Sequence, residues 1–179
     1  VGALCFLPDH RLAVATWDGE GAVYLVDGLM PGDERGITVK RFAAGLGEPL
    51  GMVFFEGHLV VAQKQEVTRL VDTDGDDEAD RYEVIAGGWP ASHNYHEFTF
   101  NLVAKDGFLY TATSVPLKSG LTNYTPGSEP AYAVGRGPGT ILKIDPNGGT
   151  WEIVAEGLRT PNGMGFGTDG ELFVCDNQG

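Results

Sequence analysis

Carboxylate side chains recur at alternate positions between Asp72 and Asp80, in a short turn rich in Asp and Gly. Calcium takes about six to eight oxygen ligands, and Asp72, Asp74, Asp76 and Asp80 fall at the first, third, fifth and ninth positions of an EF-hand-type loop. Asp77 stands where that loop has a glycine, and no helices are expected around the turn, so only the ligand spacing matches. We expect a structural calcium site here; the alternative is a solvated turn whose Asp and Gly residues serve its conformation alone.

A histidine, His96, stands just before the apolar stretch 98–103, which we expect to be a β-strand. Its imidazole, with an ordinary pKa of about 6.5, can accept a proton at neutral pH, and loops at strand ends carry many functional side chains. Glu97 is a poor orienting partner, because adjacent residues of a strand point to opposite faces. From the residues alone His96 is a candidate catalytic base, with a hydrogen-bonded structural role as the alternative.

Two polar residues distinguish the segment 157–164 from an earlier copy of the same pattern. Residues 45–52 and 157–164 share the pattern Gly-Leu-x-x-Pro-x-Gly-Met, but Arg159 and Asn162 replace a glycine and a leucine of the first copy. The shared pattern therefore reflects repeated architecture, whereas the added polar groups point to function. The arginine offers a planar fork of donors suited to carboxylate oxygens.

A repeated unit must position these residues. Each unit begins with two apolar runs separated by a polar turn, and leucines at 12, 59, 109 and 172 mark the second run at intervals of roughly 50 residues, as propeller blades require. The predicted hairpins are 3–6 with 12–15, 52–55 with 59–62, 98–103 with 109–112, and 164–166 with 172–175. The last interval is longer, and its excess falls in the Gly-, Pro- and Ser-rich stretch 115–138, which we expect to be an inserted loop.

A second pair of strands follows the hairpin in the first three units. These pairs are 22–26 with 38–42, 66–71 with 82–86, and 140–144 with 151–155. Four short antiparallel strands in a repeat of this length predict an all-β fold, a β-propeller of about three to four blades in a single domain over 1–179. Because propellers close with about four to eight blades, we expect this partial propeller to be a fragment of a longer protein or to complete its ring by association.

The overall composition excludes some functions. A formal net charge of −13, with no basic cluster, disfavours nucleic acid as a partner. No uncharged apolar stretch approaches the roughly 18–20 residues of a transmembrane helix. The hydrophobic content of 42% is that of a globular chain.

The motifs resemble those of the soluble quinoprotein sugar dehydrogenases, the glucose/sorbosone dehydrogenase-like β-propellers that use pyrroloquinoline quinone (PQQ). In that family a His starts a strand leading to Asp-Gly-x-Leu-Tyr, and here His96 leads to Asp-Gly-Phe-Leu-Tyr at 106–110. The family pattern Gly-x-Arg-Asn-Pro-x-Gly-Leu-x-Phe, then Asp-Gly-x-Leu and a polar turn, is similar to 157–166, 169–172 and 176–179. The acidic turn and the Asp-Asn-Gln-Gly ending look closer still to bacterial membrane-bound-dehydrogenase-type propellers, often fused to cytochrome c domains.

The resemblance implies an oxidoreductase that passes hydride from a sugar or related alcohol to PQQ. It makes His96 the general base for the hydroxyl proton, Arg159 a ligand of the quinone's carboxylates or carbonyls, and Asn177 a further cofactor contact. It also implies a cytochrome c domain as electron acceptor and a periplasmic or extracellular location. Thr160 stands where the family has Asn, and the family's catalytic calcium is not assigned to the acidic turn, which is a separate feature.

Two other functions remain open. The Pro-Asn-Gly of 161–163 before Asp169-Gly170 also resembles gluconolactonase-type propellers, in which Asn162 would bind a divalent metal and a metal-bound water would attack a lactone. The third possibility is a non-catalytic propeller that binds carbohydrate or protein, because one fold hosts many functions.

Overall fold

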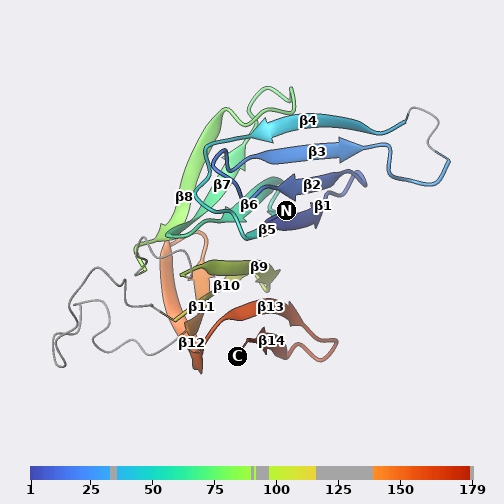
Figure 1. The fold of residues 1–179 in the computed structure, drawn as a ribbon. Helices are drawn as coiled ribbons and strands as arrows, with labels where there is room; N and C mark the ends of the chain where they lie inside the picture. Colours follow the sequence, from blue (N-terminus) through green and yellow to red (C-terminus); the bar gives the residue numbers. More distant parts are fainter. Residues whose placement is uncertain (33–35, 90, 92–96, 116–138, 178–179) are drawn as a thin grey trace.

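The computed structural model describes residues 1–32, 36–89, 91, 97–115 and 139–177. Regular structure in these residues consists of β-strands only, so the described chain has no helix that could cross a membrane. Figure 1 shows the arrangement of the strands. They are β1 (Ala3–Phe6), β2 (Leu12–Ala15), β3 (Val23–Asp27), β4 (Thr38–Ala43), β5 (Gly51–Phe55), β6 (His58–Ala62), β7 (Glu66–Val71), β8 (Arg81–Gly87), β9 (Thr99–Lys105), β10 (Phe108–Thr113), β11 (Gly139–Asp145), β12 (Thr150–Leu158), β13 (Pro161–Phe166) and β14 (Leu172–Asp176).

The strands form separate antiparallel sheets in chain order. β1–β4, β5–β8 and β9–β12 are four-stranded sheets in which each strand pairs with its neighbours in sequence, and β13 pairs with β14 in a two-stranded sheet. These are three blades and the first hairpin of a fourth. The structure therefore confirms the predicted all-β propeller of four-stranded antiparallel blades.

The first strands of successive blades lie against one another. β5 contacts both β1 and β9, and β9 contacts β13, so these four strands follow each other down the middle of Figure 1. Because neighbouring strands are antiparallel, the connections of each blade alternate between two faces of the molecule. We call the face at which the even-numbered strands end and the odd-numbered strands begin the entry face. The odd-numbered strands end at the opposite face.

The core lies between the blades. Alternate residues of β6 point to the two neighbouring blades. Leu59 and Val61 pack toward the first blade, whereas Val60 and Ala62 pack toward the third. Since both sides of this strand are covered, its sequence is a continuous apolar run rather than an alternating one. A third cluster centres on Phe100 and joins the third blade to the hairpin of the fourth.

The strand predictions are accurate to within a few residues. β1, β2 and β7 have the predicted bounds. β13 begins at Pro161 rather than at Met164, because Pro161 pairs with Asp176 beyond a bulge, and a first strand position needs no proline N–H. Apart from Val115, the predicted inserted loop at 115–138 lies outside the described residues.

Candidate functional site

The topology brings the candidate cofactor-binding residues to the entry face. Arg159 lies in the β12–β13 connection, and Asn177 directly follows β14. His96 falls between β8 and β9 in the sequence and lies outside the described residues. The acidic turn is the β7–β8 connection, and it belongs to the opposite face.

Arg159 and Asn177 are held together by the ends of the β13–β14 hairpin. The Asp176 carboxylate accepts hydrogen bonds from the backbone N–H of Arg159 at 3.1 Å and of Thr160 at 2.8 Å. The Asn177 N–H donates to the Thr160 carbonyl at 3.1 Å, and the Arg159 guanidinium donates to the Asn177 carbonyl at 3.4 Å. The Arg159 side chain is exposed, so the remainder of its donor fork faces no partner among the described residues. This pair can therefore receive an anionic group from solvent.

Asn101 is a site-supporting residue that the sequence reasoning missed. Its backbone N–H donates to the Leu50 carbonyl of the second blade at 3.1 Å, and its side-chain amide donates to the Pro161 carbonyl of the fourth at 3.3 Å. Counted from the paired leucines, Asn101 takes the place that Gly51 and Gly163 hold in their blades. Its φ of 58° is in the left-handed region, which Asn tolerates better than most residues. An Asn inside an apolar strand was the available signal.

A buried polar network fixes the start of β9, just after His96. Thr99 is 1% exposed; its hydroxyl donates to the Lys64 carbonyl at 2.8 Å and accepts from the Trp89 indole N–H at 3.0 Å. Phe98 packs edge-on against Trp17, with ring centroids 5.8 Å apart. These contacts determine where the β8–β9 connection ends on the entry face.

The acidic turn gathers three of its four predicted ligands. Single carboxylate oxygens of Asp72, Asp74 and Asp80 all lie within 4.8 Å of one another. Asp76 is not one of this group, and its carboxylate accepts the backbone N–H of Glu78 at 2.9 Å. The three clustered groups supply hard oxygen donors, the chemistry that calcium prefers.

Hydrogen bonds within the turn favour the ionised form of two of these carboxylates, Asp72 and Asp80. Partial burial acts to raise the pKa of Asp72, but backbone N–H bonds from Gly75 and Asp77 outweigh it and lower that pKa. The hydroxyl and backbone N–H of Thr73 lower the pKa of Asp80. Asp72 and Asp80 therefore keep their negative charge at neutral pH.

The acidic turn also joins two blades. Asp77 pairs with Arg11 of the β1–β2 turn at 2.8 Å, and the Ala79 N–H donates to the Phe42 carbonyl of β4 at 2.7 Å. Lys40 of β4 donates to the Asp76 carbonyl. A metal in this turn would therefore act on the contact between the first and second blades rather than on Arg159.

The comparisons with known proteins identify a family and a fold. The family described as "Domain of unknown function (DUF7133)" matches residues 24–179. No curated protein matches the chain.

One similar solved structure is that of a Thermus thermophilus protein assigned as an oxidoreductase (glucose dehydrogenase), with 20% sequence identity and a TM-score of 0.62. The match covers 96% of this chain and 56% of that one, so the chain spans about half the length of that protein. At this identity the likeness concerns the fold.

Proposed function

We propose that this chain, which belongs to the DUF7133 family, is part of a quinoprotein-type oxidoreductase that oxidises a sugar or related alcohol with PQQ as hydride acceptor. The proposal concerns the full-length protein, since this chain covers only part of the solved propeller that it resembles. The observation that carries it is the pairing of Arg159 with Asn177 on the entry face, the face at which β9 begins.

The donor set at this position suits the proposed cofactor. PQQ is a tricarboxylic quinone, and an exposed guanidinium whose fork is only partly used can bind a carboxylate or carbonyl oxygen of such a molecule. Asn177 supplies a further polar contact beside it. Arg159 and Asn177 would hold the cofactor, and Asp176 would position both through the hydrogen bonds to the β12–β13 connection.

The proposed oxidation also requires a base that removes the hydroxyl proton of the substrate. Bound PQQ supplies the acceptor for the substrate's hydride. His96 would take the proton of the oxidised hydroxyl, as an imidazole can at neutral pH. The Thr99 network would position that residue by fixing the end of its connection. A cytochrome c domain as electron acceptor and a periplasmic or extracellular location belong to the same proposal and rest on the family resemblance.

Titration of the full-length, calcium-loaded protein with PQQ, monitored by absorbance, tests the function. Reduction of the bound PQQ is then measured with a panel of aldoses. Arg159→Leu should weaken PQQ binding by about tenfold, the loss of one charge-assisted contact. Arg81→Leu is the matched control, because that arginine is 62% exposed on β8 and pairs with Glu83. Equal PQQ affinity of both variants and the parent protein would remove the assigned role of Arg159. Absence of PQQ binding by the parent, with hydrolysis of a lactone in the presence of a divalent metal, would favour the lactonase alternative and Asn162.

A structural calcium ion in the acidic turn is a separate part of the proposal. Asp72, Asp74 and Asp80 would bind it and so stabilise the contact between the first two blades. Calcium at about 100 times its dissociation constant adds about 2.7 kcal/mol to the free energy of unfolding. Asp74→Ala should abolish the rise in melting temperature that calcium produces over chelator, whereas Asp76→Ala should keep most of it. An equal loss of stability by Asp74→Ala in calcium and in chelator would exclude the metal.

A further inference from the structure

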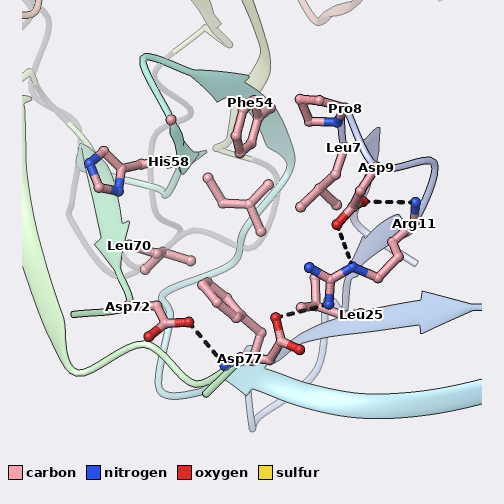
Figure 2. Close-up of a pocket in the computed structure, with 13 residues that line it drawn as sticks. Leu7, Pro8, Asp9, Arg11, Leu25, Phe54, His58, Leu70, Asp72 and Asp77 are labelled. Carbon is pink, nitrogen blue, oxygen red and sulfur yellow. Dashed lines mark hydrogen bonds and ion pairs between the residues drawn. The ribbon is translucent and has the colours of Figure 1, made fainter. Parts of the chain in front are cut away.

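A cavity of about 340 Å³ lies on the opposite face, between the first and second blades. Figure 2 shows the side chains around it. Its base consists of Leu25, Phe42, Leu59 and Leu70, which are at most 9% exposed and belong to the core between these blades. The volume is at the lower end of that of small-molecule sites, and the apolar base is typical of them.

The rim of the cavity is charged. Asp9, Arg11, His58, Asp72 and Asp77 line it. Arg11 donates to Asp9 and to Asp77, each at 2.8 Å, so this cation is already paired with two of the three carboxylates. The rim therefore presents a net negative charge above an apolar floor.

Two polar groups of the rim can still engage a ligand. One oxygen of Asp77 receives the Arg11 hydrogen bond, and the other has no hydrogen-bond partner among the residues that the structure describes. Within the same residues the His58 ring has none either. In Figure 2 the His58 ring lies on the other side of the cavity from Arg11, so a ligand between them could reach a carboxylate and an imidazole together.

We propose that this cavity binds a small organic cation, an ammonium group carried on an aromatic or branched aliphatic body. The body would pack on Phe42, Leu59 and Leu70, and the ammonium would donate to the second oxygen of Asp77. Nothing in the proposed oxidation requires this site, which is on the face away from Arg159.

The charge pattern selects against other ligands of the same size. A carboxylate or phosphate would meet Asp9 and Asp77 and would have to displace one of them from Arg11. A sugar would place hydroxyl groups on the apolar base, where they would lose their hydrogen bonds to water without replacement. The chain's net charge of −13 adds a general attraction for cations.

The experiment is isothermal titration of the full chain, in calcium-free buffer, with three probes of similar shape. Phenethylamine should bind, and 2-phenylethanol and 3-phenylpropionate should each bind about fivefold more weakly or worse, the factor of one partly exposed ion pair. Methylammonium, which has the charge without the body, should also bind at least about tenfold more weakly. Equal affinity for amine and alcohol, or tighter binding of the carboxylate, would overturn the proposal.

Variants locate the site. Asp77→Asn should weaken phenethylamine binding by about fivefold and leave the affinity for 2-phenylethanol unchanged. Asp76→Asn removes the same charge from the same turn but from a residue that does not line the cavity, so it should retain the parent affinity. If Asp77→Asn does not fold, the NMR signals of the His58 imidazole in the parent protein, assigned by comparison with His58→Gln, test the site instead. These signals should shift when phenethylamine is added. An unchanged His58 signal at saturation would exclude this cavity.

Discussion

Replacing Thr99 by valine tests whether the buried polar network at the start of β9 stabilises the entry face. Valine has the same shape as threonine but has no hydroxyl, so the substitution removes the 2.8 Å bond to the Lys64 carbonyl and the 3.0 Å bond from the Trp89 indole without opening a cavity. Thr99 is 1% exposed, so water cannot replace either bond.

The expected loss follows from what remains after the substitution. The Trp89 N–H also lies 3.2 Å from the Lys64 carbonyl, so neither partner is left without a hydrogen bond. The variant should therefore lose the net value of two bonds, about 1–2 kcal/mol of unfolding free energy, rather than the larger penalty of a stranded buried group. For a chain of this size that corresponds to about 3–6 °C in melting temperature.

Thermal and denaturant unfolding of Thr99→Val and of Thr38→Val, at an exposed position of β4, measure the difference. The control should stay within about 0.5 kcal/mol of the parent. A Trp89→Phe variant and the double variant complete a cycle, in which we expect a coupling of about 0.5–1.5 kcal/mol. If Thr99→Val is as stable as the control, the network does not stabilise the start of β9, and its positioning role for His96 fails with it.

Two further perturbations test the packing and the charges of the entry face. Gly51→Ala should lower the free energy of unfolding by about 2 kcal/mol or more, because a Cβ at this position would overlap the backbone of Asn101 in the next blade. Gly19→Ala is the control and should not lower it, because open space surrounds that position. Equal melting temperatures of the two variants would show that the blades can separate without loss of stability. Asp18→Asn should make the melting temperature fall less steeply as the pH is lowered. The backbone N–H of Gly21 and other donors of the β2–β3 turn lower the Asp18 pKa from its usual 3.8, so this stability is present above about pH 4 and is lost as the pH falls through the lowered value. Melting temperatures from pH ~5 to ~2.5 that run parallel in parent and variant would refute the assignment.

Local patterns in the sequence are enough to specify the blade architecture. Apolar runs separated by polar turns specify hairpins through local patterning, and the leucines of β2, β6, β10 and β14 recur once per hairpin. The ligand spacing of the acidic turn is local in the same way, because Asp72 and Asp80 are joined by a short stretch of chain. Such features need no knowledge of distant contacts, and for this reason the strand bounds agreed closely with prediction.

Which residues meet across blades depends on the packing of the folded chain. The contact of Arg11 with Asp77, which builds the rim of the cavity, joins residues 66 positions apart, and nothing in either segment's local pattern specifies it. The hydrogen bonds of Asn101 to the second and fourth blades likewise depend on how the first strand of each blade packs against that of the next blade. Local sequence sets the period of the strands, whereas the packing of neighbouring blades selects the side chains that share a site.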